Sequence, residues 1–214
     1  MKTTIRLGLL CGIFLSLDAV ADELRYREEV AGKTTQYTQV SKHAQSTVVQ
    51  YPDDRFEIRT DPAGATLWVE VSSPRASAKV SVTRDGAALR LTSGATLQEL
   101  DQQPWHQSPF LLEGFVTSGE KELAFWTLTT SGEVANGGRS VNALKLVARR
   151  EGTERLNVNG AELETVHVMI TVPGFRSLFW KAHYWYRLDG TLVRYEEPRG
   201  KKGFVRGELM SQTP

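Results

Sequence analysis

The segment 180–188 holds the densest group of side chains suited to binding. Aromatic and basic residues alternate there, and a β-strand would place alternate residues on opposite faces. One face would carry Trp180, Ala182, Tyr184, Tyr186 and Leu188, and the other would carry Lys181, His183, Trp185 and Arg187. Aromatic rings offer a large contact area and bind planar groups or cations. The pattern predicts an aromatic-lined cavity or a cationic interaction surface, and it also fits a buried core face backed by a solvated one.

A second candidate for binding is the Pro-flanked loop 102–109, which carries Trp105 and His106 and leads into the apolar run 110–112. At the mouth of a barrel such a loop can act as a lid over a ligand. Alternatively, it packs on the open end of the barrel as part of the core. The predicted ligand-binding residues are Trp105, Trp126, Phe175, Trp180, Tyr184 and Tyr186.

The sequence predicts no metal site and no cofactor. The four histidines, His43, His106, His167 and His183, have no recognised ligand spacing, so a zinc site would have to assemble from distant strands. A phosphate-binding loop and a dinucleotide fingerprint are both missing.

Motifs for catalysis are also missing, and we expect no catalytic residues. The serines before Gly94 and Gly119 lack the strand–serine–helix elbow of hydrolases. Adjacent carboxylates, such as Glu28 and Glu29, would point to opposite faces of one strand, which suits acid–base work poorly. An enzyme would need two or more members of the set His167, His183, Asp189 and Glu196 to meet in one cleft.

The elements that must position these residues are short strands. Alternating apolar runs are separated by turn residues throughout the chain, and Asp85-Gly86, Asn159-Gly160 and Asp189-Gly190 are typical of tight hairpins. Residues 95–101 favour a helical turn, residues 110–115 a short helix or strand, and the Gly-rich tail a loosely held end. The fold class predicted is mainly β: an antiparallel, strongly curled sheet or (half-)barrel of about 10–12 strands, with one or two short helices.

The first 21 residues resemble a cleavable secretory signal peptide. Lys2 and Arg6 precede an apolar stretch over 7–17, which is too short to cross a bilayer as a helix. A small-x-small triplet follows, so cleavage is expected between Ala21 and Asp22, leaving a single antiparallel β domain over 22–214. The expected location is the periplasm, or the outside of the cell, with no transmembrane anchor after cleavage.

Cleavage would change what the exported chain can do. Cys11, the only cysteine, lies in the leader, so the exported part has no thiol and no disulfide. The 26 basic and 25 acidic residues of the whole chain lose Lys2, Arg6 and Asp18, which leaves 24 of each. This neutral balance gives no reason to expect a nucleic-acid partner.

Two segments carry a resemblance to known proteins. Residues 26–32 read Tyr-Arg-Glu-Glu-Val-Ala-Gly, and residues 185–196 run from Trp185 through the Asp-Gly turn to Glu196. These segments resemble uncharacterised exported β-barrel families that are loosely related to periplasmic lipoprotein carriers. The resemblance implies an apolar concavity that accepts a lipid or acyl chain, and it transfers no site residues.

Together these features favour an exported, non-enzymatic binding or carrier protein for an apolar or amphipathic ligand such as a lipid. One alternative is a protein-interaction module of a cell-envelope complex that uses Lys181, His183, Trp185 and Arg187. A second alternative is an enzyme that acts on an envelope lipid or glycan.

Overall fold

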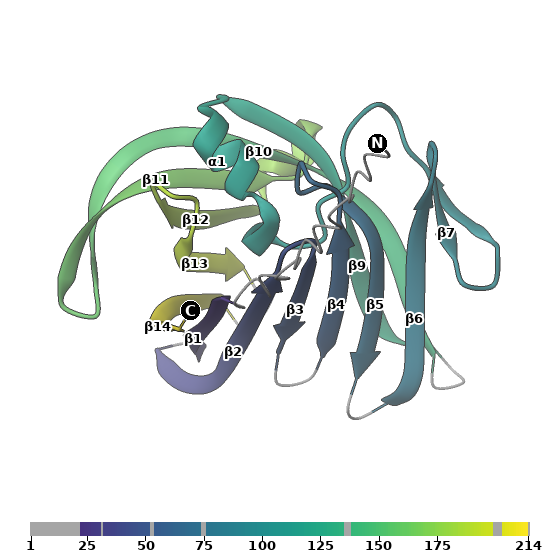
Figure 1. Cartoon of the computed structure of the whole chain (residues 1–214), viewed down its shortest axis with the longest axis horizontal. Coiled ribbons are helices and arrows are strands. Elements are labelled where there is room, and N and C mark those ends of the chain that lie inside the picture. The colour runs from purple at the N-terminus through teal and green to yellow at the C-terminus, as the bar shows by residue number, and fades with distance from the viewer. Residues whose placement is uncertain are drawn as a thin grey trace, which may run out of the picture.

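The computed structural model describes residues 22–213 except 31, 52–53, 74–75, 135–137 and 199–202. Within these residues the chain forms one sheet of 14 strands, in which every neighbouring pair is antiparallel. Figure 1 shows that the sheet curls strongly on itself, with the helix α1 at one end. The predicted fold class, a mainly β curled sheet or half-barrel with short helices, is confirmed.

The sheet consists of two meanders joined through the chain ends. The first runs through β1 (Asp22–Val30), β2 (Lys33–His43), β3 (Ser46–Gln50), β4 (Arg55–Thr60), β5 (Thr66–Ser73), β6 (Ala76–Asp85), β7 (Ala88–Leu91) and β8 (Thr96–Glu99). The second runs through β9 (Glu122–Val134), β10 (Gly138–Val158), β11 (Ala161–Thr171), β12 (Lys181–Arg187), β13 (Leu192–Pro198) and β14 (Phe204–Thr213). Because β1 pairs with β14, β8 and β9 form the two edges of the sheet.

Three short helices complete the described fold. The 3-10 helix η1 (Pro109–Leu111) and α1 (Glu113–Ser118) lie between β8 and β9, and the 3-10 helix η2 (Gly174–Leu178) connects β11 to β12. We call residues 109–118 the cap.

The strand number exceeds the predicted 10–12 because two segments pair that were expected not to. Residues 96–99, predicted as a helical turn, form the edge strand β8, since Leu89 and its neighbours in β7 offer a free edge. The tail was expected to be loose, but it forms β14 between β1 and β13. Val205, Gly207 and Leu209 alternate inward there, which is the period of a strand.

The segment 104–107 lies between β9 and the start of β5 and links them by hydrogen bonds. Trp126 of β9 donates its N–H to the Pro104 carbonyl and accepts the His106 N–H, both at 2.8 Å, and the Thr66 N–H donates to the Trp105 carbonyl at 2.6 Å. The Trp105 side chain is fully buried. This segment thus gives the β9 edge a partner that β8 does not supply.

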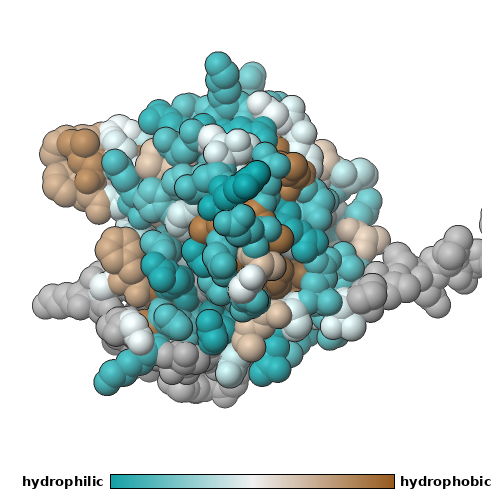
Figure 2. All heavy atoms as spheres, turned by 90° about the vertical axis from the view of Figure 1, so that its left-hand side faces the viewer, coloured by the Kyte–Doolittle hydropathy of each residue, from teal (hydrophilic) through white to brown (hydrophobic). Residues whose placement is uncertain are grey.

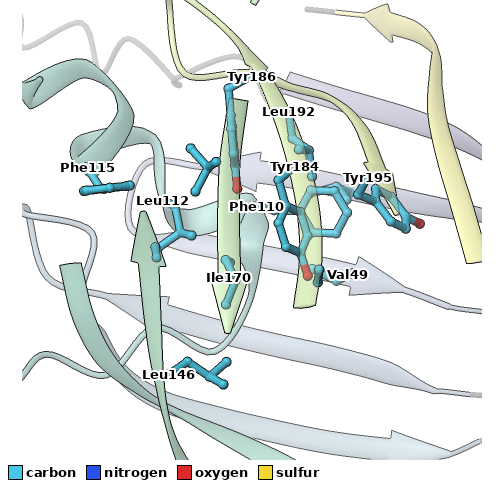
Figure 3. Packing of buried hydrophobic residues seen from close by; sticks show 14 of the residues in the cluster. Val49, Phe110, Leu112, Phe115, Leu146, Ile170, Tyr184, Tyr186, Leu192 and Tyr195 are labelled. Carbon is cyan, nitrogen blue, oxygen red and sulfur yellow. The ribbon is translucent and has the colours of Figure 1, made fainter. Parts of the chain in front are cut away.

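The interior is filled by alternate residues of the strands and by the cap. Tyr26 and Phe110 lie with ring centroids 5.1 Å apart, and Phe110 meets Tyr195 edge-on at 6.2 Å. Figure 3 shows Phe110 beside Tyr184 and Tyr195, with Leu112 and Phe115 further along the same layer. The cap therefore packs its apolar side chains directly onto the inner face of the sheet.

Candidate functional site

The cap closes one end of the curled sheet. Phe110, Leu112 and Phe115 point into the core and are at most 7% exposed. Tyr186 donates its hydroxyl to the Pro109 carbonyl at 3.0 Å. At the rim, the Lys42 Nζ lies 3.6 Å from a Glu113 carboxylate oxygen. The loop 102–109, predicted as a possible lid, leads into the cap, and its residues 104–107 hydrogen-bond to β9 and β5.

Two clefts lie on either side of the start of α1. The larger has a volume of about 420 Å³ and lies between α1 and the tips of β2–β5. The smaller has a volume of about 220 Å³ and lies between α1 and the segment 104–106. Ala63, Leu111 and Gly114 line both clefts. The larger volume is in the range of small-molecule sites.

The smaller cleft is lined mainly by apolar residues, together with Ser118, Glu120 and one buried histidine. Its apolar lining residues are Ala63, Ala65, Pro104, Leu111, Phe115 and Leu123. His106 also lines it and is only 8% exposed. The His106 Nδ1 is fully buried and has no hydrogen-bond partner among the described residues. A buried acceptor without a partner costs about 1–3 kcal/mol, so this atom is suited to accept a hydrogen bond from a ligand.

The protonation state of His106 follows from its surroundings. Burial lowers its pKa to about 4, despite a hydrogen bond to the Gly64 backbone and the charge of Asp61. The ring also meets Phe125 edge-on at 5.8 Å. At neutral pH the ring is therefore uncharged and carries a single N–H. Because Nδ1 is the nitrogen without a partner, we assign the N–H to Nε2, with the Gly64 backbone as its acceptor, and this leaves Nδ1 as an acceptor.

The low pKa of His106 predicts a pH-dependent stability. Below pH 6.5 the unfolded chain binds a proton at this histidine, whereas the folded chain does not until pH 4. The free energy of unfolding should therefore fall by about 3 kcal/mol between these pH values and level off below them. Urea unfolding of the wild type and His106→Gln at several pH values measures this, because the other histidines cancel in the difference. Parallel pH profiles would contradict the assignment.

The aromatic residues predicted to bind a ligand fall into different environments. Trp105, Tyr184 and Tyr186 are buried in the packed interior, Trp180 is half-buried, and Phe175 is 75% exposed. Trp126 faces outward, where its Nε1 donates to an Asp101 carboxylate oxygen at 3.0 Å. None of these six residues lines either of the two clefts beside α1. Tyr184 and Tyr186 keep the parity that the alternation of 180–188 predicted.

A buried carboxylate accounts for part of this interior packing. Glu28, 1% exposed, accepts hydrogen bonds from the Tyr195 hydroxyl and, at 2.7 Å, from the Thr38 hydroxyl. Tyr184 donates to a Glu197 carboxylate oxygen at 2.8 Å. Burial raises the pKa of both tyrosines well above the usual range, so they remain donors. Glu28 and Glu197, which are absent from the predicted site, are thus built into the wall of the interior.

His183 and Trp185, two residues of the predicted interaction surface, lie on the outer face of β12. His183 and Trp185 are joined there by His167, whose ring stacks on Trp185 at 4.9 Å and 7°. The His167 Nε2 and His183 Nδ1 lie 2.9 Å apart, and the Trp185 Nε1 donates to Glu154. Burial lowers the pKa of His167. These side chains hydrogen-bond to one another and stack, so they form a compact cluster on this face.

The remaining polar candidates lie apart from the two clefts beside α1. Lys181 is exposed beside the stack, and Arg187 pairs with Asp189 at 3.2 Å in the β12–β13 turn. Glu196 pairs with His183 on the neighbouring strand, on the outer face, and lines neither of the two clefts beside α1. Within the described residues, no group of three or more His, Cys, Asp or Glu side chains is arranged to hold a metal ion.

Sequence reasoning missed part of the cleft lining. Ala63, Gly114 and Leu123 carry no chemical signal in the sequence, and they meet only because the cap lies against the β4–β5 loop and β9. His106 was visible as part of a Pro-flanked loop, but its unpartnered nitrogen depends on burial by distant segments.

Comparisons with known proteins support the fold. No family model and no curated protein matches the sequence. A β-barrel-like protein of the domain of unknown function DUF1849 from Brucella abortus has a TM-score of 0.59 at 10% identity, covering 92% of this chain and 98% of that chain. The resemblance to uncharacterised exported β-barrel families is therefore confirmed at the level of the fold.

Two further solved structures show a more distant similarity. The hypothetical lipoprotein YmcC from Escherichia coli has a TM-score of 0.46 at 9% identity, covering 90% of this chain and 88% of that chain. A DUF1089 family protein from Pseudomonas aeruginosa has a TM-score of 0.44 at 14% identity, covering 89% and 96%. In the described part of this chain, no helix is both long and apolar enough to span a lipid bilayer.

Proposed function

We propose that this chain is an exported, non-enzymatic binding or carrier protein that holds an amphipathic ligand in the clefts beneath its cap. The observation that carries the proposal is the buried His106 Nδ1, which has no hydrogen-bond partner among the described residues and belongs to a side chain that lines the smaller cleft, whose wall is mainly apolar. The predicted leader supports a location in the cell envelope.

The chemistry of the cleft restricts the ligand. An apolar wall accepts an alkyl chain or ring, and a neutral imidazole acceptor requires a hydrogen-bond donor on the ligand. A hydroxyl or amide N–H satisfies this requirement, whereas a carboxylate does not. We therefore favour a neutral amphiphile, such as a fatty alcohol or the glycerol hydroxyl of a lipid.

The interior behind the cap does not offer the same space. Phe110 and the tyrosines fill it in ring contact, and the hydroxyls of Tyr26, Tyr184 and Tyr186 all have protein acceptors. The aromatic residues of β12 and β13 thus form the rigid wall on which the cap rests. The proposal places the ligand at the cap itself.

Binding of dodecanol, compared with dodecane, tests the proposal. Dodecanol should bind to the purified protein and change its tryptophan fluorescence, since Trp105 lies between Pro104 and His106, two residues that line the smaller cleft. His106→Phe, which removes the acceptor, should weaken dodecanol binding roughly tenfold and leave dodecane unaffected. His106→Gln, which keeps an acceptor, is the matched control and should bind dodecanol more tightly than His106→Phe.

A second variant blocks the space without removing a hydrogen bond. Gly114 lines both clefts, and leucine favours a helix more than glycine does, so Gly114→Leu should fold and exclude dodecanol. Native mass spectrometry of protein extracted gently from the envelope should also show a retained amphiphile. A protein that carries no amphiphile and does not respond to dodecanol would refute the proposal.

A further inference from the structure

The connection between β11 and β12 exposes a cluster of large apolar side chains. Phe175, Leu178 and Phe179 are 75%, 68% and 74% exposed. The two phenylalanine rings meet edge-on with centroids 5.2 Å apart, so they form one protrusion and not two isolated residues. Exposed apolar clusters of this kind mark contact surfaces for proteins or membranes.

The end of β14 adds to the same surface. Phe204 begins β14 and is 60% exposed. The pairing of His183 with Glu196, and of Glu196 with Arg206, places Phe204 and Lys181 at the same end of the sheet. Figure 2 shows brown groups that stand out at the left edge of a largely hydrophilic face.

The charges of the residues next to this cluster indicate what kind of partner it fits. The segment 173–182 contains Arg176 and Lys181 but no aspartate or glutamate. Lys181 is exposed directly after the apolar cluster. Protruding apolar side chains next to the exposed Lys181, in a segment without carboxylates, match a bilayer that has anionic headgroups over an apolar layer.

We infer that this end of the sheet docks on the surface of an anionic lipid bilayer, with Phe175, Leu178 and Phe179 entering the interface. The convex shape favours a bilayer over a small ligand, because a protrusion cannot enclose one. This inference is independent of ligand binding beneath the cap, which uses other residues.

Flotation with vesicles tests the inference on the exported protein, whose intact mass is measured first to establish where its chain begins. Vesicles of phosphatidylglycerol and phosphatidylethanolamine should retain the wild type. The double variant Phe175→Ser with Phe179→Ser should lower the partition coefficient by roughly tenfold or more. Lys181→Glu should lower it about fivefold on these vesicles, and not on phosphatidylcholine alone.

Leu188→Ser is the matched control, because Leu188 is 56% exposed at the opposite end of β12. It should leave vesicle binding unchanged, and the double phenylalanine variant should still bind dodecanol. A wild type that does not float, or a double variant that floats equally well, overturns the inference. Loss of self-association in the double variant without any vesicle binding would assign the surface to a second copy of the chain and overturn it as well.

Discussion

Replacing Gly207 by alanine is expected to lower the free energy of unfolding by about 3 kcal/mol, a large effect for a single added methyl group. Gly207 pairs directly with Tyr195 across β13 and β14. An alanine Cβ at this position would overlap the Tyr195 ring, and it would lie only 2.6 Å from the Tyr195 hydroxyl oxygen.

The tyrosine ring has little freedom to move away. Its hydroxyl donates to the buried Glu28, and its ring packs against Phe110 and Tyr26 with centroids 6.2 and 6.1 Å away. Moving the ring would break the hydrogen bond to a buried carboxylate, which is costly. The strain of the extra methyl group is therefore expected to appear as lost stability.

A double-mutant cycle measured by urea unfolding checks this result. In a Tyr195→Ala background the cost of Gly207→Ala should fall below about 0.5 kcal/mol, because the clash is gone. Gly114→Ala is the control, since its Cβ would make an ordinary 3.5 Å contact with the Ala63 carbonyl. Equal costs of Gly207→Ala in both backgrounds would show that the tyrosine is not the cause.

Replacing Gln107 by alanine should cost about 3–4 kcal/mol. The Gln107 side chain accepts the Leu128 N–H at 3.1 Å and donates to the Leu128 carbonyl at 3.2 Å, so it imitates a strand neighbour for β9. It also accepts the Trp105 Nε1–H at 3.1 Å. Alanine would leave three buried polar groups without partners and a cavity beside Trp105.

Hydrogen exchange gives this prediction a local test. In Gln107→Ala the Leu128 amide should lose its protection well before the amides of β12, because the β9 edge opens first. Gln107→Glu should also be destabilised, since it buries a charge and removes the donor to the Leu128 carbonyl. Gln102→Ala, an exposed position in the same loop, should cost less than about 0.5 kcal/mol. Unchanged exchange at Leu128 would argue against the role of Gln107 as the hydrogen-bonding partner of the β9 edge.

Much of the local structure could be predicted from the sequence. In β12, Ala182, Tyr184 and Tyr186 are buried while the intervening residues are half-buried, as the alternation indicated. Asn159 and Gly160 both have positive φ, 51° and 83°, which is the tight hairpin that this pair favours. Both features depend only on neighbouring residues.

The errors arose where pairing partners decide the outcome. The short run at 96–99 has too few residues to show a strand period clearly, and it pairs only because β7 lies next to it. The tail was expected to be loose because it contains glycines. In the structure it lies between two strands, where Gly207 pairs with Tyr195. Pairing of β1 with β14 brings together residues from opposite ends of the chain, and local patterns carry no information about it.

The sequence by itself determined the class of fold, the turns at the Asp-Gly and Asn-Gly pairs and the two faces of β12, because these follow from period-two alternation and turn chemistry. Only the tertiary structure decided which of those residues meet. Tyr195 reaches Glu28 across 167 positions, and His106 loses its partners only when α1 and β9 bury it. Such contacts depend on how the whole sheet curls and closes, and this is decided by packing over long sequence separations.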